Sequence, residues 1–242
     1  MSALVVDNLC KRFGGIEAVR GCSFAVPAGQ ITGLIGPNGS GKTTVFNLIT
    51  ALLWPDAGEA RFRGRPLTAL RPEQVFALGI GRTFQVARIF PRLTVLENML
   101  VPMRRLGARA LCAGAAGHER RRALDLLRFV ELADCAGDPA GSLSYGQRKL
   151  LELGTALMGD PDLILLDEPA GGVNPALLER IESRVRDLHR QGRTFLIIEH
   201  NMRTVMRLCH RIVVLHRGAT IAEGDPEAVR RDPAVLDAYL GE

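Results

Sequence analysis

Gly36-Pro37-Asn38-Gly39-Ser40-Gly41-Lys42-Thr43 spells the pattern G-x-x-x-x-G-K-[ST], which is typical of a phosphate-binding loop. An apolar run, Ile31–Ile35, precedes this segment, and a stretch with helical spacing, Thr44–Leu52, follows it. Glycines let the backbone turn its N–H groups toward a phosphate, and the N-terminus of the next helix adds a favourable dipole. The alternative is a glycine-rich turn without function. The strand-like and helix-like flanks favour the phosphate loop over this alternative. The sequence therefore predicts a loop that binds a nucleoside triphosphate.

Side chains at the end of this loop have the chemistry that a bound triphosphate requires. Lys42 can reach the β- and γ-phosphates, and the Thr43 hydroxyl can bind Mg²⁺. Thr44, the first residue of the predicted helix, belongs to the same predicted site. We therefore expect the ligand to be a nucleoside triphosphate with its Mg²⁺ ion.

Two carboxylates, Asp167 and Glu168, follow the apolar run Leu163–Leu166. A buried parallel strand delivers the residues at its C-terminal end to the crevice where ligands bind in open α/β sheets. Asp167 is then placed to hold Mg²⁺, and Glu168 is placed to activate the attacking water as a general base. Two acids after a strand can also cap a helix. The phosphate loop upstream favours the catalytic interpretation.

The segment Leu143–Gln147 reads Leu-Ser-Tyr-Gly-Gln and opens a predicted helix. Ser144 suits the N-cap position, and together with the Gly146 amide it presents hydrogen-bond donors to an anion. Plain capping is the usual meaning of such a start. Its position upstream of Asp167 favours a second anion-binding element.

Strand-like and helix-like stretches alternate along most of the chain. Short β patterns bounded by Gly and Pro turns fall at Leu4–Asp7, Ala18–Val26, Gln30–Ile35, Glu59–Phe62, Leu163–Leu166, Thr194–Glu199, Ile212–Leu215 and Thr220–Glu223. Helical spacing falls at Thr44–Leu52, Pro72–Leu78, Thr94–Arg105, Glu119–Leu132, Tyr145–Met158, Pro175–Gln191 and Met202–Leu208. This alternation predicts a largely parallel sheet with helices on both faces, into which the helical middle of the chain is inserted.

Composition and charge exclude several classes of protein. The 242 residues, 47% of them hydrophobic and 24% charged, suit one large globular domain or two small ones. The apolar runs are far shorter than the roughly 20 residues that span a bilayer, and the N-terminus has no signal-peptide pattern. Five cysteines without C-x-x-C spacing favour free thiols in a reducing cytosol. A dispersed net charge of +5 with only 5% aromatic residues predicts no nucleic-acid partner.

Taken together, these motifs resemble the ATPase subunits of ABC transporters, and the resemblance covers essentially the whole chain. Gly36–Thr43 is similar to the Walker A loop of that family, Leu163–Glu168 to its Walker B strand and Leu143–Gln147 to its signature motif. The same resemblance identifies four further positions: Gln85 as the Q-loop glutamine, His200 as the switch histidine, Gly171–Asn174 as the D-loop and Phe13 as the aromatic that stacks on adenine.

The resemblance implies roles for these residues. His200 contacts the γ-phosphate and helps to place the attacking water, whereas Gln85 contacts Mg²⁺ or water and couples the site to a membrane partner. A glutamine or histidine alone is more often structural, and Phe13 can be simple core filling, so these roles rest on the resemblance. The chain departs from the commonest family residues at Tyr145 and Asn174. Both changes leave Ser144 and Gly146 in place.

The family fold is α/β: a RecA-like P-loop NTPase core with an N-terminal antiparallel β subdomain and an inserted α-helical subdomain. We expect residues 1–85 and 160–242 to form the core with its β subdomain, and residues 86–159 to form the helical signature subdomain. In this family, the signature motif of one subunit closes over the ATP that the Walker A loop of another subunit holds. The resemblance therefore implies an ATP-dependent dimer, either with itself or with a sister ATPase.

Within the family, the likeness is to the ATPases of branched-chain amino acid importers. It is carried by Arg12–Val19, Ile80–Gln85, Leu93–Asn98, an insertion around Pro102–Gly117, Asp167–Pro175, Ile198–Met202 and Asp232–Gly241. This likeness implies two transmembrane permease subunits, a separate substrate-binding protein and a peripheral place on the cytoplasmic side of the inner (plasma) membrane. The permeases would contact the groove near Gln85–Leu96. Similar ATPases serve urea, amide or lipopolysaccharide transport, so these substrates stay open.

Three other functions are compatible with a phosphate loop. An ABC ATPase that acts on nucleic acid or ribosomes usually has tandem cassettes or long coiled-coil insertions, and this sequence has neither. A regulatory subunit that binds ATP without hydrolysing it does not need Glu168 and His200. A GTPase would have an Asn-Lys-x-Asp motif, which is missing here, and a P-loop kinase has no place for the signature helix.

Overall fold

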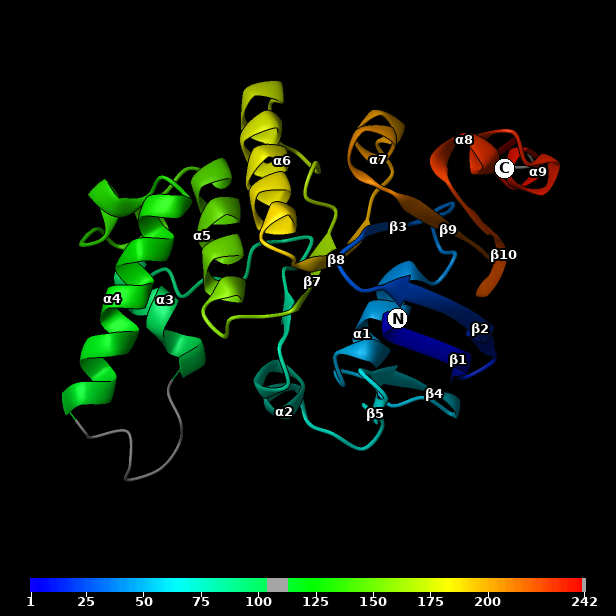
Figure 1. Cartoon of the computed structure of the whole chain (residues 1–242), viewed down its shortest axis with the longest axis horizontal. Coiled ribbons are helices and arrows are strands. Elements are labelled where there is room, and N and C mark those ends of the chain that lie inside the picture. The colour runs from blue at the N-terminus through cyan, green and yellow to red at the C-terminus, as the bar shows by residue number, and fades with distance from the viewer. Residues whose placement is uncertain (104–112, 241–242) are drawn as a thin grey trace.

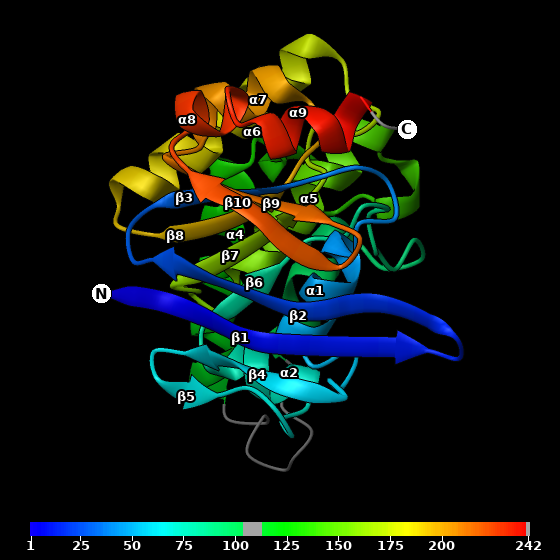
Figure 2. The ribbon, with the colours of Figure 1, turned by 90° about the vertical axis from the view of Figure 1, so that its right-hand side faces the viewer.

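The computed structural model describes residues 1–103 and 113–240, and within these ranges the strands form two sheets (Figures 1 and 2). The larger sheet has the strand order β10-β9-β3-β8-β7-β6. Its strands are β3 (Ile31–Ile35), β6 (Ile80–Arg82), β7 (Leu163–Asp167), β8 (Thr194–Ile198), β9 (Arg211–His216) and β10 (Ala219–Gly224). All neighbours are parallel except β10, which pairs antiparallel with β9. The predicted largely parallel sheet is confirmed.

The smaller sheet is antiparallel and has the order β2-β1-β4-β5. Its strands are β1 (Ser2–Phe13), β2 (Ile16–Pro27), β4 (Ala57–Phe62) and β5 (Arg65–Pro66). The two long strands β1 and β2 form a hairpin, and β4 pairs with the other edge of β1. Figure 2 shows this sheet below the parallel sheet, with α1 (Lys42–Ile49) beside it. The chain therefore contains the antiparallel β layer that the family resemblance implied.

Helices cover the parallel sheet and extend from one end of it. They are α2 (Pro72–Ala77), α3 (Val95–Leu100), α4 (Ala113–Phe129), α5 (Tyr145–Leu157), α6 (Pro175–Arg190), α7 (Met202–Leu208), α8 (Pro226–Arg230) and α9 (Pro233–Leu240). Figure 1 shows α3, α4 and α5 together at one end of the molecule, and α8 and α9 at the other. Within the described residues, no helix combines the length and the apolar character that crossing a bilayer requires. The subdomain boundaries given above stay a prediction.

The central parallel strands are mostly apolar, as expected for strands with both faces buried. All residues of β3, β7 and β8 are buried. Successive side chains point to opposite faces, so Phe195 and Ile197 join the core under α5, α6 and α7, whereas Leu196 and Ile198 join the core between the two sheets. Phe46 of α1 lies in the second core. Predicted site residues lie at the C-terminal ends of these strands: the phosphate loop follows β3, Asp167 ends β7, and His200 comes shortly after β8.

The structure differs from the predicted elements in a few places. The strand β6 was not predicted, because three residues with a central glycine carry no period. The helices α8 and α9 were not predicted either. α3 ends at Leu100, earlier than the predicted Arg105, because Pro102 lacks the N–H that a helix interior uses; a 3₁₀ turn at Val101–Met103 follows. The predicted helix end and insertion between residues 104 and 112 lie outside the described residues, as does Gly241.

Candidate functional site

The phosphate loop connects the buried end of β3 to the first turn of α1. The ammonium group of Lys42 folds back over the loop: its Nζ donates to the carbonyl oxygens of Gly36 and Pro37 at 2.7 Å each and to Ser40 Oγ at 3.3 Å. Lys42 is only 8% exposed. The ammonium is therefore held at the concave side of the loop by acceptors that a phosphate can replace.

Two glycines let the loop pass close to neighbouring strands. A Cβ on Gly36 would lie 2.0 Å from the carbonyl oxygen of Leu215 in β9, and a Cβ on Gly41 would lie 2.4 Å from the carbonyl oxygen of Ala18 in β2. Both have positive φ, at 145° and 99°. A side chain is excluded at both positions by backbone atoms that cannot move aside. The glycines of the motif are thus required by this fold before any ligand binds.

Asp167 ends β7 and is 2% exposed. Its Oδ2 lies 3.1 Å from Nη2 of Arg82 in β6, and Arg82 Nη1 also donates to Asn47 Oδ1 and Thr50 Oγ1, at 2.8 Å each. Burial raises the pKa of Asp167, and the Arg82 charge opposes this effect. The other oxygen, Asp167 Oδ1, is buried and makes no hydrogen bond to the described residues. An orphaned carboxylate oxygen fits a water molecule or a hard cation as its missing partner.

The three predicted catalytic residues lie together. Gln85 Nε2 donates to Glu168 Oε2 at 2.8 Å, and His200 Nδ1 lies 3.8 Å from the same oxygen. The Glu168 side chain is 19% exposed and the His200 side chain 64% exposed. Glu168 has a positive φ of 48°, directly after β7, which turns the chain sharply there. The carboxylate is thus held at the open edge of the sheet, between residues that are far apart in the sequence.

Several buried charged residues at this edge were not identified from the sequence, and two of them lie at or next to strand ends. One is Arg82, the partner of Asp167. The other is Glu199, 1% exposed, which accepts from the backbone N–H of Ala170 at 2.7 Å and from those of His200 and Asn201 at 3.1 Å each. Burial raises the pKa of Glu199. Glu199 thereby ties the segment after β7 to the segment after β8. For Glu199 the available signal was a charged residue directly after an apolar run, whereas no such run adjoins Arg82.

The predicted signature residues lie at the start of α5. Ser144 caps the helix: its Oγ accepts from the Gln147 N–H at 3.3 Å, and Gln147 Oε1 accepts from the Ser144 N–H at 2.9 Å. Gly146 packs against Leu177 of α6. The Tyr145 hydroxyl donates to the carbonyl oxygen of Gly171 at 3.1 Å. Within one chain, the contacts of Ser144 and Gly146 are therefore with helices α5 and α6 rather than with the phosphate loop.

Phe13 lies at the exposed end of β1. Its side chain is 45% exposed, and Lys11 Nζ lies 5.7 Å from the ring centroid. The alternative that Phe13 fills the core is therefore wrong. Thr43, which is exposed, and Thr44 lie in the first turn of α1. A cavity of about 200 Å³ borders the other side of the phosphate loop, with Pro37–Ser40, His216, Arg217 and Asp237 in its wall.

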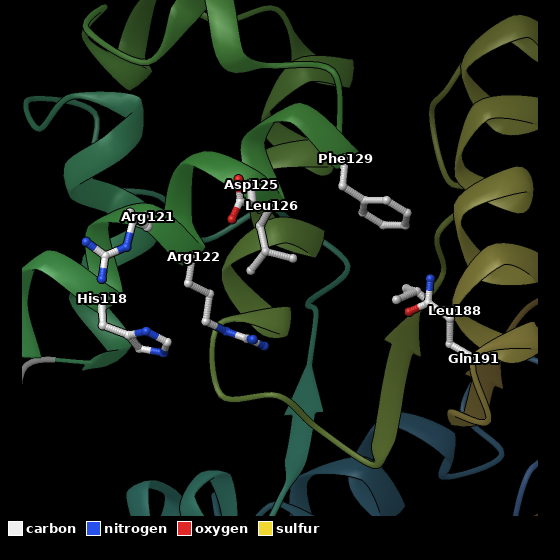
Figure 3. A pocket seen from close by; sticks show the side chains of 8 residues that line it. All are labelled: His118, Arg121, Arg122, Asp125, Leu126, Phe129, Leu188 and Gln191. Carbon is white, nitrogen blue, oxygen red and sulfur yellow. The ribbon is translucent and has the colours of Figure 1, made fainter.

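A larger cavity, of about 430 Å³, lies elsewhere. Its wall is formed by α4 and the C-terminal part of α6, and Figure 3 shows Arg121, Arg122 and Phe129 on one side and Leu188 and Gln191 on the other. None of the predicted site residues lines it. Cavity size therefore does not locate the chemistry in this molecule, whereas the convergence of buried charges does.

Comparison with known proteins identifies the family. A family model described as "ABC transporter" matches residues 19–171, from β2 past the end of β7. This chain belongs to the ABC transporter family. A second model, described as "Branched-chain amino acid ATP-binding cassette transporter", matches residues 219–242 at the C-terminus.

Full-length relatives and solved structures agree with this assignment. The high-affinity branched-chain amino acid transport ATP-binding protein BraF of Pseudomonas aeruginosa is 39% identical, with 99% of this chain and 98% of BraF covered. A crystal structure of the ADP conformation of an ATP-binding cassette of an ABC transporter has a TM-score of 0.88 at 37% identity and covers 100% of both chains. A dimeric cassette in a post-hydrolysis state, bound to ADP and Pi, has a TM-score of 0.80 at 27% identity, over 92% of this chain and 98% of the other.

Membership of the ABC transporter family confirms several predictions. The fold is the α/β P-loop fold of ABC cassettes, the bound ligand is a nucleotide, and the activity is ATP hydrolysis. The rival interpretations as a GTPase or a P-loop kinase are excluded by the same match. The roles assigned to individual site residues stay predictions.

Proposed function

We propose that this chain is the ATP-hydrolysing subunit of an importer for branched-chain or other hydrophobic amino acids. The observation that supports this most directly is the relative named for branched-chain amino acid transport, which matches over essentially the full length of both chains. The family model described as "Branched-chain amino acid ATP-binding cassette transporter" matches residues 219–242, so this support is independent of the phosphate loop. Urea, amide or lipopolysaccharide transport with the same ATPase role is the second candidate.

In the proposed mechanism, the phosphate loop binds the triphosphate. The backbone N–H groups of residues 39–43 and the Lys42 ammonium bind the β- and γ-phosphates, which replace the Gly36 and Pro37 carbonyl oxygens as acceptors for Lys42. The Phe13 ring, half exposed and beside Lys11, offers a stacking surface for adenine. In this proposal the loop therefore binds the phosphates, and Phe13 of β1 contacts the base.

The residues around Asp167 fit Mg²⁺. Asp167 keeps one buried oxygen without a hydrogen-bond partner among the described residues, while Arg82 holds the other. Thr43, Gln85 and Asp167 would hold the ion, which would neutralise charge on the phosphates. Arg82 contacts Asp167 Oδ2 and thereby fixes the orientation of the carboxylate, including its second oxygen Oδ1.

Glu168 is the proposed general base. Its carboxylate takes a proton from the attacking water, while the Gln85 amide, at 2.8 Å, fixes the orientation of the carboxylate. His200, close to the same oxygen and largely exposed, can contact the γ-phosphate and help to place the water. Because these groups lie at the open edge, the site lacks a cover on the side of the γ-phosphate.

A second cassette supplies that cover in our proposal. Ser144 is exposed at the N-terminus of α5, and Ser144 and Gly146 would donate to the γ-phosphate held by the partner's loop. The dimeric structure of a 27% identical cassette supports the formation of a dimer. We further propose that the dimer, with itself or a sister ATPase, binds two transmembrane permease subunits on the cytoplasmic side of the membrane. A separate substrate-binding protein would deliver the amino acid.

The substrate is tested by transport. The chain is reconstituted in liposomes with its permeases, its sister ATPase if there is one, and its binding protein, and uptake of labelled leucine is compared with that of urea. We expect ATP-dependent leucine uptake that a Glu168→Gln variant abolishes. Uptake of urea alone would replace the proposed substrate, and ATPase stimulation by RNA without any uptake would reject the transport role.

A further inference from the structure

A buried carboxylate on α5 contacts the segment that carries Gln85. We call this segment, Phe84–Arg88, the Q-loop. Glu152 Oε1 accepts from the backbone N–H of Phe84 at 3.1 Å and from that of Arg88 at 3.2 Å. Glu152 is 5% exposed. One oxygen therefore joins the two ends of the Q-loop, and Gln85 lies between them.

A second side chain of the same helix face holds the middle of the Q-loop. Lys149, one helical turn before Glu152, donates from Nζ to the Gln85 carbonyl oxygen at 2.7 Å and to the Glu168 carbonyl oxygen at 3.3 Å. Lys149 is 6% exposed. The backbone around Gln85 is thus fixed from α5, the helix whose first turn carries the signature residues. Among the described residues, no backbone–backbone hydrogen bond of a local turn forms within the Q-loop.

The location of Glu152 is costly for a residue with only a structural role. Its second oxygen, Oε2, is buried and makes no hydrogen bond to the described residues. Glu152, Phe84 and Arg88 also border a cavity of about 180 Å³, together with Arg82 and Thr155. Burying a carboxylate lowers stability unless hydrogen bonds or opposite charges compensate both of its oxygens, and Oε2 lacks such a hydrogen bond among the described residues. Here the two bonds that it does make are both directed at the Q-loop.

We propose that Glu152 is a positioning residue for ATP hydrolysis: by accepting from both ends of the Q-loop, it holds Gln85 where its amide reaches Glu168. Glu152 does not touch nucleotide in this arrangement; it acts through the backbone of the Q-loop. The inference rests on the proposed role of Gln85 in the reaction. It adds a residue of α5 to the machinery, so that the signature helix and the general base are joined by side-chain contacts within one chain.

The first test compares three variants of the purified chain, or of its assembled complex where the chain alone is inactive. Glu152→Met keeps the volume and removes the acceptor, Glu152→Gln keeps an acceptor oxygen, and Thr155→Ala changes the next turn of α5 in the same cavity wall. We expect kcat for ATP to fall about 10-fold in Glu152→Met with KM within about twofold, and to stay within about threefold in Glu152→Gln and Thr155→Ala. Equal kcat for Met and wild type, or equal loss in Met and Gln, would overturn the proposal.

The second test is a double-mutant cycle with Gln85→Ala. If Glu152 acts through Gln85, adding Glu152→Met to Gln85→Ala lowers kcat by less than about threefold further. Full multiplication of the two losses overturns the positioning role. A normal kcat in Gln85→Ala overturns the role of Gln85 and, with it, this inference. A lowered kcat in Gln85→Ala together with a normal kcat in Glu152→Met overturns the inference alone.

Hydrogen exchange tests the same contact directly, and it remains available if Glu152→Met does not fold. The amides of Phe84 and Arg88 should exchange slowly in wild-type protein and in Glu152→Gln, because both donate to a buried oxygen. The amide of Val86, an exposed residue of the same loop, gives the reference rate. Exchange of the Phe84 and Arg88 amides at that reference rate would reject the contact.

Discussion

The phosphate loop and the Q-loop are both needed at one site, yet they are built differently. The phosphate loop, residues 36–43, takes its shape from its own glycines and from acceptors inside the loop that Lys42 contacts. The Q-loop, residues 84–88, takes its shape from Glu152 and Lys149, which are more than 60 residues away in the chain. The glycines and the Lys42 contacts of the first loop lie within its own sequence, although Gly36 and Gly41 also pack against β9 and β2, whereas the second loop is held by side chains of α5. We therefore expect the first loop to be disrupted by substitutions within it, and the second loop to be disrupted also by substitutions in α5.

The largest expected effect is the loss of the one cation in the locally built loop. Lys42→Ala should abolish nucleotide binding and reduce hydrolysis at least about 1000-fold, because no other side chain of the loop carries a positive charge to the phosphates. Binding of fluorescent ATP and phosphate release measure the two effects. Arg63→Ala, which removes an exposed charge paired with Asp162, is the control and should behave as wild type. Normal turnover in Lys42→Ala would remove the loop from the mechanism.

Glu168→Gln separates ATP binding from hydrolysis at the carboxylate that the Q-loop contacts. The amide cannot take a proton from water, so we expect hydrolysis to fall about 1000-fold while ATP still binds. An ATP-bound dimer should then accumulate, which size-exclusion chromatography with light scattering detects. Glu227→Gln on α8, an exposed position, is the matched control. A strictly monomeric Glu168→Gln chain in saturating ATP would contradict the proposed second cassette.

The same contrast explains what the sequence could and could not predict. The motif Gly36–Thr43 and the run before Asp167 were identified because each depends on residues that are adjacent in the chain. The strand β6 and the partners of the Q-loop were missed, because β6 is three residues long and Arg82, Lys149 and Glu152 acquire their meaning only when β6, α5 and β7 meet. In a helix of regular period, a buried Glu152 is indistinguishable from a solvated one until its neighbours are placed.

Arg82 extends the comparison to the metal-binding carboxylate. Arg82 is 6% exposed and contacts Asp167, Asn47 and Thr50, so that Arg82→Met leaves a buried carboxylate without its cation. We expect a loss of about 3 kcal/mol in the free energy of unfolding, measured with denaturant at pH 7.5. Arg61→Met, at an exposed pair with Glu59, should cost far less. A stability equal to that of wild type would mean that Asp167 is held by other groups.

The smallest expected effect concerns the pH dependence of stability at Glu152. Burial raises the pKa of Glu152 from 4.5 to about 7, against the opposing effects of the Arg88 and Phe84 N–H groups and the charge of Lys149. Between these two values the folded protein binds more protons than the unfolded chain, so the free energy of unfolding falls as pH rises through that window. From pH 5.5 to pH 8.5 the contribution of Glu152 amounts to about 2 kcal/mol.

Glu152→Gln isolates this contribution, because a neutral amide keeps the acceptor for the Q-loop but does not titrate. Burial also raises the pKa values of Asp167 and Glu199, so both residues lower the free energy of unfolding as pH rises. This effect is present in wild type and variant alike, and it cancels when the two curves are subtracted. Denaturant unfolding at several pH values should therefore show a wild-type curve that falls more steeply toward pH 8.5 than the variant curve. Parallel curves would show that Glu152 is less buried than its contacts indicate. A steeper wild-type curve beside an unchanged kcat in Glu152→Gln would mean that the carboxylate lowers stability while its acceptor oxygen serves the Q-loop.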